Sequence, residues 1–275
     1  MKKLISALLA LVLVVGLGAC GSKAELGSKD NKVKIGVVGD DTDVWEFVIK
    51  KLEKDGTYVE LVKFLDYNQP NEALLSGDIN LNSFQHQNFL DNFNKEKKSD
   101  LVAIGNSILA PLGLYSKKIK KVSEIEDKAK IAIPNDVTNG SRSLVLLQTA
   151  GLIKLRTDKK AAFVKDDIVE NPHKFEIVEL DASQTARSLD DVAIAAINNG
   201  MAVDAGFDPL NDPIFIEPVN DASKPFINII VSRNEEKDKE IYKKIVKAYQ
   251  AEDTKEVIKK TSKGATIPAW ELESK

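Results

Sequence analysis

The only cysteine of the chain, Cys20, ends an apolar stretch at the N-terminus, and its position limits how the rest of the chain can be stabilised. Lys2 and Lys3 precede an apolar run over residues 4–17, and small residues separate that run from Cys20. A basic start, a short apolar run and small residues before the cut are typical of a secretory signal peptide. The run is also shorter than the ~20 residues that span a bilayer. We therefore predict a signal peptide over residues 1–19 and no transmembrane helix.

The place of Cys20 directly after this segment predicts a lipoprotein. We expect the mature chain to begin at Cys20 and to carry a diacylglycerol and a fatty acyl chain such as palmitate; the alternative is an unmodified thiol. Acyl chains hold a protein on a membrane by about 0.8 kcal/mol per buried CH₂. The predicted location is thus the extracytoplasmic face of the cell membrane. Because lipid consumes the only thiol, the body can form no disulfide and must be stabilised by burial.

The composition is that of a folded, charged globular body. Hydrophobic residues make up 43% of the chain and charged residues 29%, which excludes a disordered or membrane-embedded protein. Loss of the two lysines in the signal segment changes the formal net charge from -3 to -5, and acidic and basic residues are interspersed. A basic run at residues 117–121 is expected to be a solvated face. Nucleic acid and anionic lipid surfaces are therefore excluded as partners.

Strands and helices alternate along the body. Residues 20–32 are small and polar, so we predict a flexible tether there and the start of ordered structure near Val33. Predicted strands are 33–38, 59–64, 101–104, 130–134, 175–180, 192–197 and 226–231, and predicted helices are 44–52, a helix from Asn71, 142–150 ending at Gly151, and 235–250. Such alternation favours an α/β architecture with largely parallel sheets.

Two extended segments predict that the chain crosses between two lobes. They are Leu109–Ser116 and the Pro- and Asp-rich Phe207–Asn228. We assign 33–115 and 226–275 to lobe I and 116–225, with the return crossing, to lobe II. A ligand cleft is expected between the lobes.

Catalytic motifs are missing from the sequence. The two histidines, His86 and His173, stand in no metal-binding spacing, and there is no phosphate-binding glycine loop, dinucleotide fingerprint or nucleophile elbow. We predict a protein that is not an enzyme and that holds no metal or cofactor. The alternatives are an extracellular enzyme, for which His86 would be the base, and an adhesion or structural lipoprotein.

A carboxylate receptor is indicated after the strand that ends at Pro134. Helix-capping residues follow, and a helix is expected to open near Ser141, so backbone N–H groups and the guanidinium of Arg142 could face one anion. Each charge-assisted hydrogen bond is worth roughly 1.5–3 kcal/mol when desolvated. The alternative is an ordinary solvent-facing arginine.

A series of ordered motifs resembles a known family. The motifs are FLDYNQPNEAL, FQHQNFLD, VAIGN, YSKKIK, IAIPNDVTNGSRSL, ENPHKFEIVEL, RSLDDVAIAAIN and PFINIIVSR. They are similar to the methionine-binding lipoproteins, the substrate-binding components of methionine ABC importers, over nearly all of residues 33–270. The resemblance implies a type II periplasmic-binding-protein fold, with two α/β lobes, two crossover segments and an amino acid in the cleft.

The resemblance also assigns site residues. Arg142 matches the arginine that holds the ligand carboxylate, and Asn139 matches the asparagine that assists it. Asn198 and Asn228 match asparagines that bind the ligand's amino group or backbone. Without the resemblance, each asparagine reads as a turn or cap residue.

Four further residues match the wall of the side-chain pocket: Tyr67, Phe84, His86 and Phe89. Sulfur on aromatic edges contributes roughly 0.3–1.5 kcal/mol per contact, so this wall suits a thioether. His86 is expected to be a hydrogen-bonding wall or a helix cap. The sequence departs from the family pattern at Phe89 and Ala110, where relatives often have tyrosine.

The resemblance implies capture of L-methionine by closure of the lobes and delivery to a membrane permease with its ATPase subunits. Because of the two departures in the pocket, a methionine-containing dipeptide, D-methionine or another apolar amino acid remains the alternative ligand.

Overall fold

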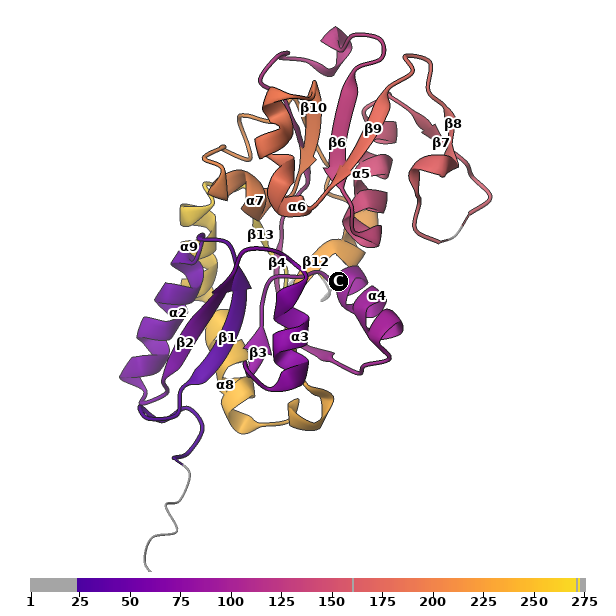
Figure 1. Cartoon of the computed structure of the whole chain (residues 1–275). Coiled ribbons are helices and arrows are strands. Elements are labelled where there is room, and N and C mark those ends of the chain that lie inside the picture. The colour runs from indigo at the N-terminus through magenta and orange to yellow at the C-terminus, as the bar shows by residue number, and fades with distance from the viewer. Residues whose placement is uncertain (1–23, 160, 271, 273–275) are drawn as a thin grey trace, which may run out of the picture.

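The computed structural model describes residues 24–159, 161–270 and 272, which form two stacked lobes (Figure 1). The predicted signal peptide and Cys20 lie outside the described residues. Among the described residues, none of the helices combines the length and the apolar character that crossing a membrane requires.

Lobe I is built on a six-stranded sheet in the order β13-β4-β12-β3-β1-β2 among the described residues. Its strands are β1 (Val33–Val38), β2 (Val59–Phe64), β3 (Leu81–Asn82), β4 (Val102–Leu109), β12 (Ile227–Ser232) and β13 (Ile267–Pro268). β1 pairs in parallel with β2 and β3, whereas β12 is antiparallel to both of its neighbours. The chain therefore returns to this sheet from lobe II and inserts a strand in its middle.

Helices cover the faces of this sheet. They are α2 (Asp43–Lys54), α3 (Gln69–Ser76), α4 (Gln87–Lys97), α8 (Glu240–Tyr249) and α9 (Glu252–Thr261), with a short 3₁₀ segment, η5 (Asn234–Glu236), before α8. In α2 the buried residues Trp45, Val48 and Leu52 recur at helical spacing and join the core of β1. The predicted helix at 44–52 is thus confirmed by an apolar stripe that faces the sheet.

Lobe II contains a five-stranded sheet in the order β11-β5-β10-β6-β9 among the described residues. The strands are β5 (Gly113–Tyr115), β6 (Lys130–Pro134), β9 (Glu176–Leu180), β10 (Ile194–Ile197) and β11 (Phe215–Ile216), beside a separate ribbon of β7 (Lys154–Leu155) and β8 (Ile168–Glu170). Its helices are α5 (Val137–Thr149), α6 (Ala182–Thr185) and α7 (Asn199–Asp204), with 3₁₀ segments η1 (Val122–Glu124), η2 (Lys165–Asp167) and η3 (Arg187–Asp190).

The two crossings are shorter than predicted and lie side by side. The first joins β4 to β5 and the second joins β11 to β12 through η4 (Asp221–Phe226). The backbone N–H of Glu217 donates to the carbonyl of Leu112 at 2.9 Å, which ties the two segments together. β5 was assigned to lobe I from the sequence, but it pairs with β10 and β11, so that boundary was several residues too late.

The prediction of a flexible tether up to residue 32 is wrong for its second half. Leu26 packs against the core of lobe I, and the N–H of Tyr58 donates to the carbonyl of Gly27 at 2.8 Å. Gly27 has φ +89°, and a Cβ there would lie 1.9 Å from the side chain of Ile241. A single apolar residue and a glycine in a polar stretch form no periodic pattern, although Leu26 is partly buried and Gly27 is buried beside Ile241 of α8.

Several element boundaries also differ from the predictions. The helix expected from residue 142 begins at Val137, because the Asp136 carboxylate caps it by accepting from the N–H groups of Thr138 and Asn139. The helix expected from residue 235 begins at Glu240 after η5. α4, α9 and β13 were not predicted. Their apolar residues are few, and tertiary contacts rather than a strong local period stabilise them.

Candidate functional site

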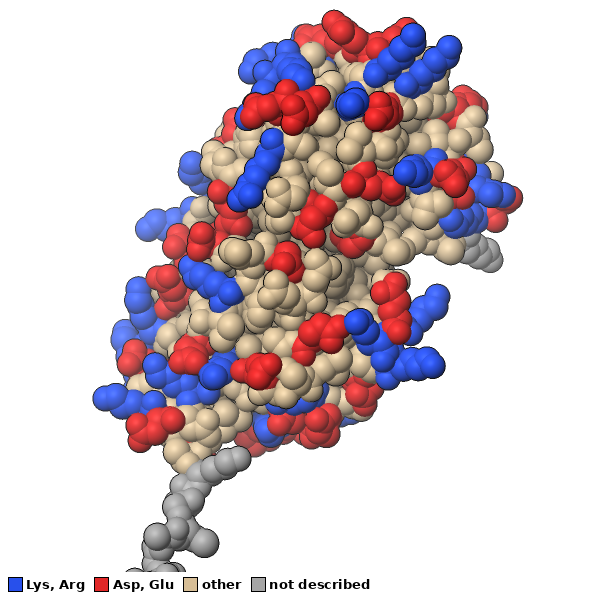
Figure 2. Space-filling model, viewed as in Figure 1, with Lys and Arg blue, Asp and Glu red and all other residues tan. Residues whose placement is uncertain are grey.

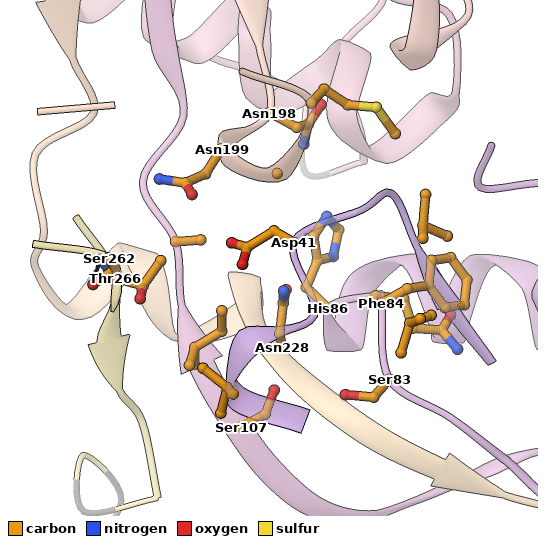
Figure 3. A pocket seen from close by; sticks show the side chains of 18 of the residues that line it. Asp41, Ser83, Phe84, His86, Ser107, Asn198, Asn199, Asn228, Ser262 and Thr266 are labelled. Carbon is orange, nitrogen blue, oxygen red and sulfur yellow. Dashed lines mark hydrogen bonds between the residues drawn. The ribbon is translucent and has the colours of Figure 1, made fainter. Parts of the chain in front are cut away.

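A cavity of about 170 Å³ lies between the lobes. It is lined from lobe I by residues that include Val37, Asp41, Tyr67, Phe84, His86, Phe89, Ser107 and Asn228, and from lobe II by Asn139, Arg142, Asn198, Asn199, Met201 and Asp204. Figure 3 shows Phe84 and His86 on one side of this cavity, Ser262 and Thr266 on the other, and Asn198 above Asn228. The eight residues that the sequence assigned to the ligand all line this one cavity.

Arg142 lies in the second turn of α5, and its side chain is only 4% exposed. Its Nε donates to Oε1 of Glu217 at 2.9 Å and its Nη2 to Oε2 at 2.5 Å; Nη2 also donates to the carbonyl of Ala110 at 3.0 Å. The guanidinium carbon stands 4.3 Å from the centre of the Phe226 ring. Nη1 donates no hydrogen bond to any of the described residues. It is therefore the part of the guanidinium that remains for a ligand.

Asn139 lies in the first turn of α5 and orients two other pocket residues. Its Oδ1 accepts from Nδ2 of Asn198 at 2.8 Å and faces Nε2 of His86 at 3.3 Å. Its Nδ2 donates to both carboxylate oxygens of Asp136, at 3.1 and 3.0 Å. The amide of Asn139 is therefore fully used within the protein, and its effect on a ligand passes through Asn198 and His86.

The amide oxygen of Asn198 accepts no hydrogen bond in the described part of the chain. Asn198 is the N-cap residue of α7, yet its side chain makes no capping bond and points to Asn139 instead. Its Oδ1 is buried and has no hydrogen-bond partner among the described residues. Such atoms are rare in folded proteins and usually mark a missing partner. Asn228, in β12, forms an isolated β-bridge with His86, and its side chain has no partner in the described part of the chain either.

Three aromatic rings form one wall of the cavity. Tyr67 lies 5.9 Å from Phe84 and 6.2 Å from Phe89, and Phe84 lies 5.8 Å from Phe89, measured between ring centres. The predicted aromatic wall is thus assembled from the β2–α3 loop with Tyr67, the β3–α4 turn with Phe84 and the first turn of α4 with Phe89. Burial raises the pKa of Tyr67, with a contribution from Asp136, so its hydroxyl stays protonated.

His86 is a cap and a wall residue. Its Nδ1 accepts from the N–H of Phe89 at 3.1 Å and caps α4, so Nε2 carries the proton that faces Asn139. Burial lowers the pKa of His86 to about 3, with a further contribution from Arg142. An imidazole with an occupied lone pair and so low a pKa is a poor general base at neutral pH.

A buried polar triad supports the segment that carries Phe84 and His86. Asn71 donates to Gln85 at 2.9 Å, Asn82 donates to Asn71 at 2.8 Å, and Gln85 donates to Asn71 at 2.6 Å and to Asn82 at 3.0 Å. All three side chains are buried. The triad holds the turn between β3 and α4 in place, and nothing in the local sequence predicted it.

No cluster of metal-ligating side chains occurs among the described residues. His173, the second histidine, lies on the surface of lobe II with Nδ1 2.7 Å from Asp127.

Residues 33–270 match the family model described as NlpA lipoprotein. The chain belongs to the NlpA lipoprotein family. A relative from Escherichia coli K12, named D-methionine-binding lipoprotein MetQ, is 44% identical over 274 residues, which cover 98% of each chain. The predicted family resemblance is confirmed, and membership of this family confirms that the chain is a binding protein and not an enzyme.

Solved structures of NlpA lipoprotein relatives confirm the predicted fold. Protein PG110 from Staphylococcus aureus superposes with a TM-score of 0.84 at 48% identity, covering 86% of this chain and 94% of that one. A nutrient binding protein from Burkholderia cenocepacia bound to methionine superposes with a TM-score of 0.82 at 43% identity, covering 86% and 99%. The chain has the type II periplasmic-binding-protein fold, with the cavity between its two α/β lobes.

Sequence reasoning missed Glu217 and Phe226, which hold the guanidinium of Arg142. Glu217 follows the apolar residues Ile214, Phe215 and Ile216 in the predicted return crossing. A single carboxylate in an apolar extended segment is a usable signal, because a buried charge needs a partner. The sequence around Glu217 does not show that its partner is Arg142, which lies 75 residues earlier.

Proposed function

We propose that this NlpA-family protein binds methionine, with L-methionine as the preferred enantiomer, in the interlobe cavity and delivers it to an ABC importer. The main support is that three features line one cavity: the free guanidinium edge of Arg142, the unpaired buried amide oxygen of Asn198, and the aromatic wall. A carboxylate, an ammonium and an apolar side chain are the three parts of an apolar amino acid. The names of the relatives supply methionine as the candidate.

The size of the cavity supports a free amino acid. One water needs about 10–15 Å³ of such volume, so 170 Å³ accommodates roughly 11 to 17 groups of that size. Methionine, with about nine non-hydrogen atoms, fits within this volume. A methionine dipeptide has more atoms and would fill this volume or exceed it. It remains the second candidate, because the polar end near Ser262 and Thr266 is the direction in which a longer ligand could extend.

The proposed pose follows from the polar groups. The ligand carboxylate accepts from Nη1 of Arg142, and the ammonium donates to Oδ1 of Asn198, with Asn228 on the lobe I side. The thioether then lies against Tyr67, Phe84 and Phe89. Charge-assisted hydrogen bonds of roughly 1.5–3 kcal/mol each, with burial of the side chain, are sufficient for an affinity near 1 μM, which corresponds to about 8 kcal/mol.

The choice of the L enantiomer rests on supply, since it is the form that proteins contain. The E. coli relative is named as a D-methionine-binding protein, so both enantiomers belong in the test.

The test is a thermal-shift screen, followed by calorimetry, of full-length protein in mild detergent that has been unfolded and refolded to remove copurified ligand. A ligand that binds only the folded state raises the melting temperature. We expect the largest shift with L-methionine. A larger shift with D-methionine, a dipeptide or another apolar amino acid would replace the ligand, and no shift with any of them would refute the proposal.

We further propose that Cys20 carries the lipid on the extracytoplasmic face of the cell membrane and that the permease and its ATPase are the partners. The family description as a lipoprotein and the position of Cys20 support this. Labelled palmitate should enter the wild-type chain but not the C20A variant, which should also be released from the membrane fraction. A membrane-bound C20A variant would refute the lipid anchor.

A further inference from the structure

A carboxylate that lines no part of the cavity stands directly behind its arginine. Glu217 accepts from Nε and Nη2 of Arg142, and its Oε2 also accepts from the N–H of Leu112 at 3.1 Å. The side chains of Glu217 and Arg142 are only 14% and 4% exposed. Glu217 comes from the second crossing and Leu112 from the first. The carboxylate is therefore held by both crossings and fixes the direction of the guanidinium.

We propose that Glu217, paired behind Arg142, makes the site selective for zwitterions over simple anions. This inference rests on the proposed function, since it takes the ligand to be an amino acid. Glu217 balances the charge of Arg142, so the buried pair is neutral overall. An anionic ligand without an ammonium would leave a net negative charge in a poorly solvated site, and electrostatic repulsion is strong at low dielectric.

The other charges that face the cavity act in the same direction. Arg142 is the only cationic side chain among the described residues that line it, whereas Asp41 and Asp204 are acidic. His86 is neutral, because burial lowers its pKa to about 3. The site thus favours a ligand that brings a positive charge together with its carboxylate. Glu217 acts through the orientation and charge of Arg142 and does not touch the ligand.

The experiment compares two probes on one variant. The probes are L-methionine and 4-(methylthio)butanoate, which lacks only the ammonium group, and the variant is E217Q in full-length, refolded protein. We expect the preference for methionine, measured by calorimetry as the ratio of the two dissociation constants, to fall about tenfold. The D190N variant removes an acid from the exposed Lys117–Asp190 pair and should keep the wild-type ratio.

A purely structural role for Glu217 would weaken both probes by the same factor, and an unchanged ratio in E217Q would overturn the proposal. The E217D variant provides a second test, also if E217Q does not fold. It keeps the charge but shortens the side chain, so both affinities should fall while the ratio stays within about twofold of wild type. If the ratio of the two dissociation constants fell as far in E217D as is expected in E217Q, the charge of Glu217 would not be the cause of the selectivity. Failure of the proposed function would look different from failure of this inference, because the wild-type protein itself would then not bind methionine.

Discussion

Nδ2 of Asn198 lies 2.8 Å from Oδ1 of Asn139, although Asn198 stands at the start of α7, where an asparagine side chain ordinarily caps its own helix. The bond directs the Asn198 amide nitrogen to α5 and leaves its Oδ1 buried without a partner among the described residues. The residue lines the cavity, so the protein gives up a helix cap and keeps a bare acceptor at the edge of the proposed ligand site.

The N198A variant should lose affinity without losing much stability. It removes an unpaired oxygen and one neutral hydrogen bond, so the free energy of unfolding of the ligand-free protein should change by no more than about 1 kcal/mol. Loss of a hydrogen bond to a charged ammonium should weaken methionine binding by about 10- to 100-fold. Calorimetry and urea unfolding measure the two effects. N92A, which removes an amide on α4 bonded to Glu96, is the matched control and should bind normally.

The Arg142–Glu217 pair should be strongly coupled. R142M leaves a buried carboxylate without its partner and should lower the free energy of unfolding by about 3–5 kcal/mol, whereas R142M/E217M should recover much of that loss. Both variants should fail to bind methionine. Urea unfolding of the single and double variants gives the coupling free energy. Additive effects of the two substitutions would show that the pair contributes nothing as a unit. Substitutions in the exposed Lys154–Glu170 pair should cost no more than about 1 kcal/mol.

His86 should make the protein less stable as the pH falls. Burial lowers the pKa of His86 in the folded state to about 3, so between about pH 6.5 and pH 3 the unfolded chain takes up a proton that the folded protein does not. Its contribution to stability is therefore complete above about pH 6.5 and is lost on acidification, with a slope of at most about 1.4 kcal/mol per pH unit.

The H86N variant should flatten this slope between about pH 6.5 and pH 5, where most carboxylates are still ionised. Urea unfolding of ligand-free protein at several pH values provides the measurement. Equal slopes for wild type and H86N would show that the imidazole is protonated in the folded protein.

Phe84 should contribute specifically to recognition of sulfur. F84L keeps an apolar wall but removes a ring that lies 5.8 Å from Phe89, so the preference for methionine over norleucine should fall by about 2- to 10-fold. F175L removes a buried ring in lobe II that stacks on His173 and is the matched control. If F84L and F175L keep the same preference, the aromatic wall does not distinguish sulfur from methylene.

The triad beneath the pocket should be important for stability. N71A removes the donor to Oε1 of Gln85 and the nearer acceptor of Nδ2 of Asn82, at about 1–3 kcal/mol for each buried group left unsatisfied. We therefore expect a clear loss in the free energy of unfolding and, because Gln85 adjoins Phe84 and His86, weaker binding. N71A with wild-type stability would mean that other groups satisfy these amides.

The sequence by itself determined the α/β class and the family, because these depend on local patterns: alternating periods and ordered motifs. It also placed β1, β2 and β6 with their observed bounds. The residue types of the site were predictable for the same reason, since each lies within a motif. The positions of α4 and α9 were not, because few of their residues are apolar and their neighbours stabilise them.

Only the tertiary structure decided what each polar group in the site can do. Arg142 reads as a free guanidinium in its motif, but Glu217, 75 residues later, occupies its Nε and Nη2. Asn198 reads as a helix cap, but its Nδ2 donates to Asn139, 59 residues earlier, and its Oδ1 is left without a partner among the described residues. Hydrogen bonds of this kind depend on distances between segments that are remote in the chain. A local pattern therefore specifies which groups are present, and tertiary packing specifies which of their atoms remain free.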